Sequence, residues 1–425
     1  MSKPAQRVHI VGTGIMGLSL GIKILEYNPK LKLIFYESPL TPGASSIASG
    51  LLHGFHGPSM QRTTWAPLGI TLFKQHVASL TSEHGQTPLL PNEIYTEKRL
   101  WRPLWREKQI PKVQALAYNY PHELSLASIQ QTQFLNANNT GYNTSIRSAH
   151  QKIFPYEVAL NTSCLQVNTS VYLNTMRQFL KSKGADFVVK KVCTNQFLHC
   201  NEYCFICTGA DLAKWIGNVL SDTQKDPRVH SLQNSHAVEF LKKTSKALYQ
   251  TSGELLAWQG AKSPLLERLA LNSRYYCLMQ PQSSTLPTGC YRFLFGSTFV
   301  RTSTAQGLDF YENKHALERA KLLENCRHYQ DLLSLENTFP QRVGASRLHS
   351  SEHLPVAVPL SSRVLGVGAL GSKGLLSHLI LAKTIAQIFR ATNEKPNNPS
   401  PCLPFSWESD DTLKRLLSIK ELFNV

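Results

Sequence analysis

The sequence is short of acidic residues and has no long uninterrupted apolar run. It contains 28 Asp and Glu against 45 Lys and Arg in 425 residues, a formal net charge of +17. No apolar segment reaches the roughly 18 to 20 residues that span a bilayer, so we expect no transmembrane segment. The first apolar stretch, Val8 to Leu25, contains Lys23 and lacks a small-residue cleavage pattern, so we expect no export signal.

Cysteine is also scarce. Nine cysteines are too few to build a disulfide scaffold in a chain this long, and they lack the paired spacings of metal ligands. We therefore expect reduced thiols in a cytoplasmic protein and no metal site. Cys204 and Cys207 form a CxxC motif, but the surrounding apolar segment is typical of a buried strand, where residues three apart point to opposite faces.

The excess of basic residues makes a polyanion, such as nucleic acid or an anionic surface, a candidate partner. These residues are scattered along the chain and form no long run. A basic surface without such a partner is therefore the simpler interpretation of the charge alone.

Glycine is concentrated in one informative place near the N-terminus. A β-branched run, Val8 to Val11, leads into Gly12-Thr13-Gly14-Ile15-Met16-Gly17, and Ile15 to Tyr27 then has apolar residues at helical spacing. A second apolar run, Leu33 to Tyr36, ends on Glu37. This order of strand, glycine loop, helix and strand predicts a βαβ unit.

Each glycine of this loop has a role in binding a dinucleotide. Gly12 permits the tight turn, Gly14 lets the backbone approach a pyrophosphate, and Gly17 allows close packing of helix against strand. Glu37, twenty residues after Gly17, can accept both ribose hydroxyls, which disfavours NADP. The pattern does not distinguish NAD from FAD. The alternative is a glycine-rich turn in another kind of α/β protein.

Three separated parts of the chain have this α/β rhythm. The second has a helix at Val171 to Lys183 and strands at Phe187 to Val192 and Tyr203 to Cys207. The third has a strand at Val364 to Val367 and a helix at Leu375 to Phe389. Irregular stretches separate the three parts, so we expect a discontinuous nucleotide-binding domain.

The expected domains follow from these parts. The nucleotide-binding domain comprises residues 1–55, 156–228 and 337–395, the substrate domain comprises 56–155 and 229–336, and 396–425 form a linker and a tail with a short helix at 411–422.

Four further motifs resemble one family. They are the small-residue loop from Gly43 to His53, the strand ending at Val192, the turn Cys207-Thr208-Gly209-Ala210 and the glycine-rich turn from Gly368 to Gly374. Together with the first loop they resemble the D-amino-acid-oxidase-like FAD-dependent oxidoreductases, which include glycine oxidase, sarcosine oxidase and D-amino acid dehydrogenase.

The resemblance implies an α/β protein with a discontinuous Rossmann-like FAD-binding domain and an α+β substrate domain built on an antiparallel sheet. It implies FAD as the cofactor and oxidation of an amine C–N bond. The cofactor-binding residues that it implies are Gly12, Gly14, Ile15, Met16, Gly17, Glu37, Ser45, Ser46, Ser49, Gly50, Leu52, Val192, Thr208, Gly209, Gly371, Ser372, Lys373 and Gly374.

Within that family, the segments Leu365 to Leu375 and His353-Leu354-Pro355 resemble the FAD-dependent half of the enzyme that builds the methylaminomethyl group of tRNA wobble uridine. This resemblance implies a modified tRNA as substrate, and the positive charge would suit it. Two alternatives stay open. One is an oxidase or dehydrogenase of a free small amino acid, and the other is a non-catalytic flavoprotein that binds RNA or a partner.

The resemblance also implies three catalytic candidates. Arg347 stands where the family binds a substrate carboxylate, and the planar guanidinium suits that group because it can bind both oxygens. Arg342 is the alternative anchor. Lys373 and the backbone N–H groups from Gly371 to Gly374 could stabilise negative charge on the flavin. His53 could reach the flavin or the substrate.

Overall fold

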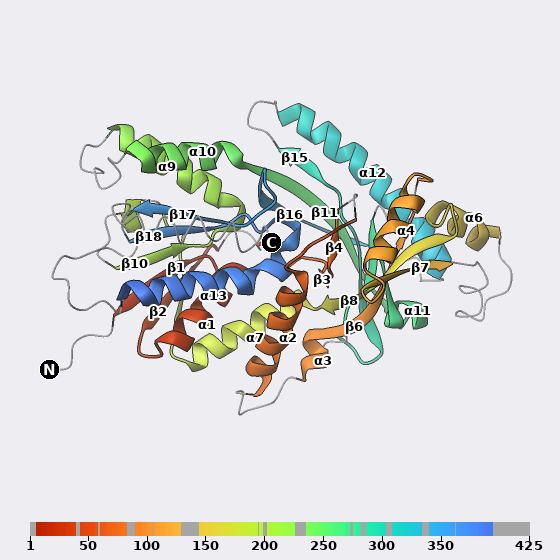
Figure 1. Cartoon of the computed structure of the whole chain (residues 1–425), viewed down its shortest axis with the longest axis horizontal. Coiled ribbons are helices and arrows are strands. Elements are labelled where there is room, and N and C mark those ends of the chain that lie inside the picture. The colour runs from red at the N-terminus through yellow and green to blue at the C-terminus, as the bar shows by residue number, and fades with distance from the viewer. Residues whose placement is uncertain are drawn as a thin grey trace.

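The computed structural model describes residues 6–39, 43–57, 60–82, 90–104, 106–128, 144–193, 195–198, 202–225, 235–272, 275–281, 286–302, 308–333, 340–361 and 363–393. Two large sheets organise these residues (Figure 1). A short hairpin of β4 (Phe55–His56) and β5 (Gln61–Arg62) lies outside both.

The first sheet is the nucleotide-binding type that the sequence predicts. Its strand order is β17-β18-β10-β1-β2-β9, and the neighbours from β18 to β9 pair in parallel, while β17 is antiparallel to β18. The bounds are β1 (Arg7–Val11), β2 (Lys32–Glu37), β9 (Asp186–Val189), β10 (Tyr203–Ile206), β17 (Val356–Ser361) and β18 (Val364–Gly368). The parallel strands end along one edge, where this fold binds ligands.

Helices cover both faces of this sheet (Figure 1). One face packs against α1 (Ile15–Tyr27), α7 (Thr169–Ser182) and α13 (Gly374–Asn393), with α2 (Ala66–Ser82) packed on α13. The other face packs against α9 (Leu212–Lys225) and α10 (Ser235–Ala247). Phe35, Leu20 and Ile385 are fully or almost fully buried in the first of these two cores.

The second sheet has ten strands and is mostly antiparallel, with one parallel pair between β6 and β12. Its main order is β15-β11-β14-β13-β12-β6-β8-β3, while β16 pairs with β11 and β7 pairs with β8. The bounds are β3 (Leu51–Leu52), β6 (Tyr95–Pro103), β7 (Leu124–Ser128), β8 (Val158–Val167), β11 (Leu248–Ala261), β12 (Leu269–Asn272), β13 (Tyr276–Met279), β14 (Cys290–Gly296), β15 (Val300–Thr302) and β16 (Gln341–Ser350).

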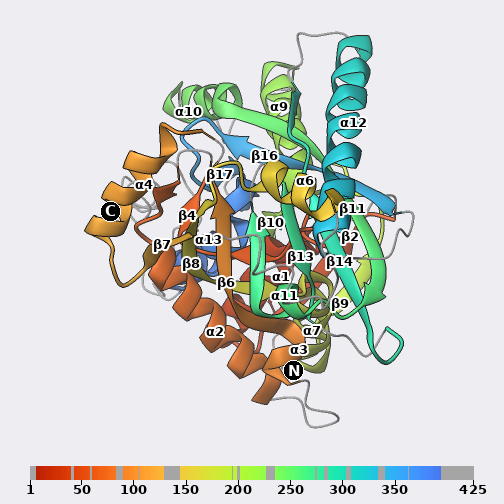
Figure 2. The ribbon, with the colours of Figure 1, turned by 90° about the vertical axis from the view of Figure 1, so that its right-hand side faces the viewer.

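Alternation along these strands gives the second sheet two different faces. Its outer face, with buried Phe293 and Phe295, packs against α12 (Leu308–Leu333) and α6 (Thr144–Ile153), as Figure 2 shows. Its inner face carries Leu255, Ala257 and Tyr276. Short elements complete the described chain: α3 (Pro91–Ile94), α4 (Gln109–Asn119), α8 (Asn195–Leu198), η1 (Gly209–Asp211), α11 (Pro264–Arg268) and η3 (Gly371–Lys373).

The predicted α/β fold and the predicted βαβ unit are confirmed, and α1 has the predicted bounds. The strand predicted to end at Val192 is shorter, because β9 stops at Val189. Three strands inside the ranges expected for the nucleotide-binding domain, β3, β8 and β16, pair within the second sheet. The helix predicted at 411–422 lies outside the described residues. Among the described helices, none is long and apolar enough to cross a membrane.

Candidate functional site

The first glycine loop joins β1 to α1 and is held by close backbone contacts. A Cβ atom on Gly12 would lie 2.4 Å from the Cys207 carbonyl oxygen, and one on Gly17 would lie 2.0 Å from the Gly12 carbonyl oxygen. Gly12 also has a φ of 105°, which a side chain disfavours. Both positions therefore require glycine for the fold itself.

Gly14 differs from these two glycines. It is the N-cap of α1, and a Cβ atom there would meet only the Ser45 hydroxyl, at 3.5 Å. Ile15 and Met16 follow as buried residues of the first helical turn, with their N–H groups at the positive end of the helix dipole. The open side of Gly14 is therefore available to a ligand rather than occupied by protein.

The small-residue loop lies against this helix start. The Ser45 hydroxyl accepts a hydrogen bond of 3.2 Å from the Ile15 N–H. The Ser46 carbonyl accepts one from Ser170, at 3.1 Å, and the Ser49 carbonyl accepts one from Gln166, also at 3.1 Å.

The end of the same loop is fixed by close packing. Gly50 has a positive φ and packs so closely on Val167 that a Cβ would lie 1.8 Å from its carbonyl oxygen. Leu52, two residues further on, is fully buried in the core beneath α13 and α2.

Glu37 is positioned at the end of β2 by a residue that sequence reasoning missed. Arg177, on α7, forms an ion pair with the Glu37 carboxylate and lies 3.4 Å from the Thr13 hydroxyl. Its guanidinium also stacks 4.8 Å from the Phe187 ring. The two partners are far apart in the sequence, so no local pattern indicates the pair.

The turn after β10 carries Thr208 and Gly209. The Thr208 hydroxyl is buried and has no hydrogen-bond partner among the described residues, while Gly209 has a φ of 61°. A buried hydroxyl without a partner costs free energy, and a bound polar group would satisfy it. Val192 lies three residues beyond the end of β9 and is partly buried against the core beneath α9.

The C-terminal glycine-rich turn leads through η3 into α13. Gly371 has a φ of 55°, and a Cβ atom there would lie 2.7 Å from His349 Nδ1. Lys373 lies with its ammonium 5.7 Å from the centre of the Trp65 ring, and burial lowers its pKa. Ser372 belongs to the same 3-10 turn, and Gly374 begins α13.

His53 lies in a buried pair rather than alone. Its ring stacks on His56 with centroids 4.4 Å apart, and its Nδ1 accepts a hydrogen bond from the Phe55 N–H. Burial, then His56 and Arg102, lower the pKa of His53 well below its usual value. Burial, then Lys373 and Arg102, lower the pKa of His56 to about 3. Both rings are therefore neutral near neutral pH. The contribution of Lys373 to the lowered pKa of His56 indicates that the lysine ammonium lies close to this ring.

Arg347 and Arg342 lie on opposite faces of β16. Arg347 is four residues from Val343, which packs on the inner face, and its guanidinium lies 5.8 Å from the Phe299 ring. Arg342 faces the outer side of the sheet. There the hydrogen bond from Arg319 lowers the pKa of Glu254, and the charge of Arg342 adds to this effect. The geometry therefore separates the two candidate anchors and leaves Arg347 on the inner face.

Tyr276 is a further inner-face residue that sequence reasoning missed. Burial raises the pKa of Tyr276, and Arg347, Ser297 and Ser49 partly offset this. Its hydroxyl has no hydrogen-bond partner of good geometry within the described residues. Tyr276 lies on β13, and only the pairing of β13 within the second sheet brings it near Arg347.

His349 joins the second sheet to the C-terminal turn. It bridges to Leu370, and its Nε2 lies 2.8 Å from the Thr251 hydroxyl. Its ring stacks on Tyr249 at 5.2 Å. Burial, then Arg347 and other cations, lower the pKa of His349 to about 4, so the ring is neutral at neutral pH. The inner face and the C-terminal turn therefore meet at Arg347 and His349.

These residues fit a long dinucleotide cofactor. The Gly14 helix start and the partnerless Thr208 hydroxyl suit a pyrophosphate and its neighbouring groups, and Glu37 suits a ribose. The turn at Gly371 and the ammonium of Lys373 lie at the other end, beside the inner face. The arrangement therefore suits a dinucleotide cofactor that extends from the edge of the first sheet toward the inner face of the second sheet.

Comparison with known proteins identifies the class more closely. A family model described as DAO, FAD dependent oxidoreductase, matches residues 7–388. The chain therefore belongs to this family of FAD-dependent oxidoreductases, and FAD is its cofactor.

Individual relatives are more distant. Glycine oxidase from Geobacillus kaustophilus has a similar structure, with a TM-score of 0.62 and 16% identity, covering 93% of this chain and 98% of that one. Iminodiacetate oxidase from Chelativorans sp. BNC1 gives a TM-score of 0.61 at 13% identity, covering 91% and 95%. These two likenesses concern the fold. Mitochondrial L-2-hydroxyglutarate dehydrogenase from Dictyostelium discoideum is 44% identical over only 54 residues, 12% of each chain.

A first prediction concerns Glu37. We expect Glu37→Ala to weaken FAD affinity by about 1.5 to 3 kcal/mol, the range for lost hydrogen bonds to a charged group. Arg177→Met should weaken FAD affinity less, because the carboxylate stays in place. Fluorescence titration of apoprotein with FAD measures both. Unchanged affinity in Glu37→Ala, with equal loss of unfolding temperature in the two variants, would mean that the pair is only structural.

Proposed function

We propose that this protein oxidises the C–N bond of an amine that carries a carboxylate. The observation that carries the proposal is Arg347, a cation on the inner face for which no described carboxylate lies within ion-pair distance. An uncompensated guanidinium beside a buried tyrosine favours an anionic ligand, since a partly buried charge needs a partner. The names of the two similar oxidases, for glycine and iminodiacetate, support an amine with a carboxylate.

The protein residues have distinct roles in this proposal. FAD, when bound, would supply the electron acceptor for oxidation of the carbon that bears the nitrogen. Arg347 binds the carboxylate through its planar fork, and the Tyr276 hydroxyl donates a further hydrogen bond to it. Lys373 and the N–H groups of the Gly371 turn hold positive charge beside the cofactor. His53 and His56 shape this region as neutral rings.

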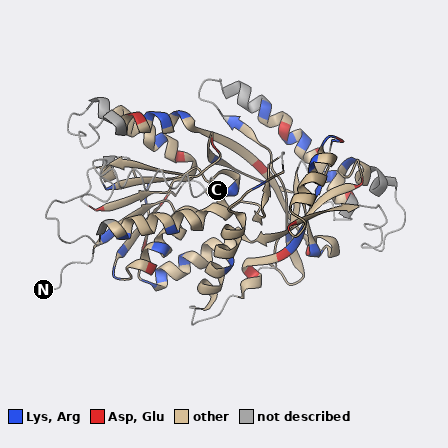
Figure 3. Ribbon diagram, in the orientation of Figure 1, with Lys and Arg blue, Asp and Glu red and all other residues tan. Residues whose placement is uncertain are grey.

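The finer identity of the amine is a second part of the proposal. A carboxymethylaminomethyl group on tRNA is supported by the motif His353-Leu354-Pro355. A free small amino acid fits Arg347 equally. Figure 3 shows Lys and Arg on elements of both sheets rather than on one concentrated patch, so charge does not favour the tRNA. We also propose a cytoplasmic location, which suits the buried thiols of Cys164 and Cys277, neither of which forms a disulfide.

The test is an anaerobic screen in which bleaching of the bound flavin is followed by absorbance. The compounds are glycine, sarcosine, iminodiacetate, D-amino acids, carboxymethylaminomethyl-tRNA and, as a hydroxy acid, L-2-hydroxyglutarate. We expect at least one carboxylated amine to bleach the flavin. Bleaching by the hydroxy acid alone would contradict C–N oxidation. No bleaching by any compound would favour the non-catalytic flavoprotein.

A further inference from the structure

A second arginine lies on the same face of the sheet as the proposed carboxylate anchor. Strands β15 and β16 both pair with β11 (Figure 1), and Thr251 on β11 is opposite Arg301 on one side and opposite Arg347 on the other. Residues that are directly opposite in an antiparallel pair share one face of the sheet. The two arginines therefore flank Thr251, with their Cα atoms about 10 Å apart, twice the spacing of opposite residues.

Aromatic stacking holds the Arg301 side chain in place. Its guanidinium lies 4.0 Å from the centre of the Tyr249 ring, and that ring stacks on His349 with centroids 5.2 Å apart. A planar guanidinium over a tyrosine ring is a favourable contact. Because the N–H groups lie in the plane of the guanidinium, this stacking leaves them available to an anion.

Neither arginine has an acidic partner in the described part of the chain. No carboxylate there lies within ion-pair distance of Arg301 or Arg347. Burial is the main cause that lowers the pKa of His349, and the charges of Arg347 and Arg301 both add to this effect. The two cations therefore act on one place without a compensating acid, and an anion bound there would offset their repulsion.

This cationic face adjoins the turn assigned to the flavin. His349 bridges to Leu370, and a Cβ atom on Gly371 would lie 2.7 Å from His349 Nδ1. The Thr251 hydroxyl, between the two arginines, lies 2.8 Å from His349 Nε2. A ligand that contacts both arginines would therefore lie beside the same turn as the reacting end of the cofactor.

The chemistry of this face favours a second carboxylate. A guanidinium binds both oxygens of a carboxylate through two parallel hydrogen bonds, and its single charge balances that of the carboxylate. A phosphomonoester would bring about two negative charges to the one cation. Phe299, which is 53% exposed and lies beside Arg347, offers apolar surface for a carbon chain that joins two carboxylates.

We propose that the amine oxidised by this protein carries a second carboxylate, which Arg301 binds across Thr251 from Arg347. This inference rests on the proposed function, in which Arg347 binds the first carboxylate. The substrate class is therefore an amine dicarboxylate, and the C–N bond that is oxidised belongs to the end that Arg347 holds.

Binding of simple diacids to the FAD-loaded full chain tests this inference without requiring turnover. Malonate, succinate, glutarate and adipate are titrated at constant ionic strength, and the change in flavin absorbance reports binding. The monomethyl ester of each acid is the matched ligand, since it has the same carbon chain and only one carboxylate. In the wild type we expect at least one diacid to bind about tenfold more tightly than its ester, as for one added charge-assisted hydrogen bond.

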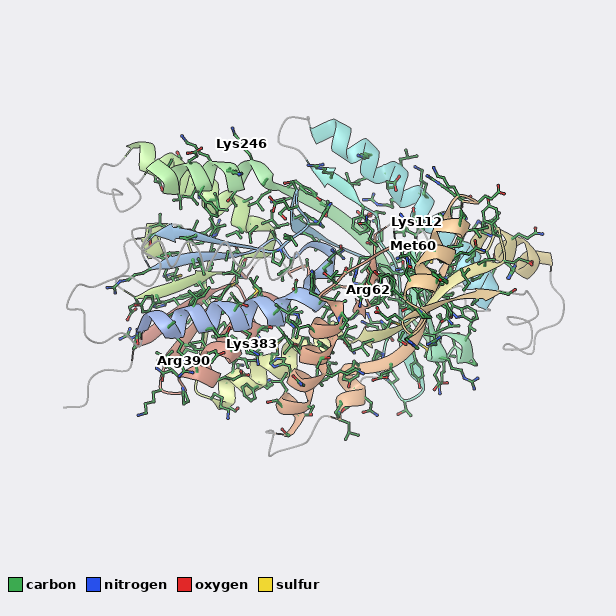
Figure 4. The ribbon with its side chains drawn as sticks, viewed as in Figure 1. Met60, Arg62, Lys112, Lys246, Lys383 and Arg390 are labelled. Carbon is green, nitrogen blue, oxygen red and sulfur yellow. The ribbon has the colours of Figure 1, made fainter. Side chains whose placement is uncertain are left out.

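Arg301→Met should remove this preference, and Arg390→Met is the matched control. Arg390 is also an exposed arginine whose guanidinium lies over a tyrosine, 5.6 Å from the centre of the Tyr27 ring. Figure 4 labels it near the end of α13, sixteen residues after Gly374, which is about 24 Å along the helix axis. We expect Arg301→Met to bind each diacid and its ester with similar affinity, and Arg390→Met to keep the wild-type ratio.

The outcomes separate this inference from the function on which it rests. Loss of ester binding in Arg347→Met supports the first anchor independently of Arg301. If the esters bind through Arg347 but the wild type prefers no diacid, or if Arg301→Met keeps the wild-type preference, the second carboxylate is overturned and the proposed function stands. If neither diacids nor esters bind saturably, the carboxylate anchor at Arg347 is wrong as well.

Discussion

Gly14→Val is expected to give a folded but colourless protein. A Cβ at Gly14 meets only the Ser45 hydroxyl, at 3.5 Å, so the protein itself can accept a side chain there. The cofactor cannot, because the valine methyl groups would fill the space that we propose for its pyrophosphate beside the start of α1. Overpacking costs about 1 to 3 kcal/mol and lost hydrogen bonds to a charged group about 1.5 to 3 kcal/mol, so FAD affinity should fall by at least about 100-fold.

Gly17→Val is the matched control for this prediction. Its Cβ would lie 2.0 Å from the Gly12 carbonyl oxygen, so this variant should lose folding as well as FAD. Circular dichroism reports folding, and flavin absorbance after incubation with excess FAD reports binding. A yellow Gly14→Val protein with wild-type FAD content would contradict the placement of the pyrophosphate at this helix start.

The part of the fold that could be predicted from the sequence is the part built from local patterns. The β1-α1-β2 unit is continuous, and the glycine spacing and the acid at Glu37 mark its turn and its end. The C-terminal turn before α13 is equally local. In both places, apolar periodicity and glycine position are sufficient, because neighbouring residues in the sequence are also neighbours in space.

The second sheet could not be predicted in the same way. Its longest strand, β11, contains Gly253 and a mixture of polar and apolar residues, and its partners lie as far away as β16. Glycine lowers the local propensity of this segment to form a strand. Packing nevertheless requires glycine here, because a Cβ on Gly253 would lie 2.7 Å from the Thr298 carbonyl oxygen. Packing also requires a glycine within α2, where Gly69 packs on the Leu376 carbonyl oxygen of α13. This glycine lowers the helix propensity of the segment, so the sequence alone did not predict α2.

Parts of the candidate site depend on those long-range pairings. The family resemblance implied Arg347 as the carboxylate anchor, with Arg342 as the alternative, but only the register of β16 on β11 places the two side chains on different faces. Tyr276 and Arg177 carry no local signal, since each acquires its role from a residue on another element. The sequence therefore indicated the cofactor loops more completely than the substrate face.

Arg347→Met should have the largest effect on the substrate while leaving the cofactor in place. The substitution keeps length and apolar bulk but removes the only charge that the proposed function assigns to the carboxylate. Cutting one partner from a buried charge pair costs about 2 to 5 kcal/mol, so apparent affinity for a carboxylated substrate should fall correspondingly. Arg347→Lys should recover only part, because a point charge cannot reproduce the two parallel hydrogen bonds of the guanidinium.

Arg342→Met provides the control, because that side chain faces α12 on the outer side of the same strand. Anaerobic flavin reduction at varied substrate concentration separates binding from chemistry, and absorbance confirms equal FAD content. If a tRNA-borne amine is the substrate, Arg347→Met should slow reduction yet leave tRNA binding largely intact, because phosphate contacts supply most of that affinity. Equal reduction by wild type and Arg347→Met, with a defect in Arg342→Met, would place the carboxylate on the outer face and contradict the proposed site.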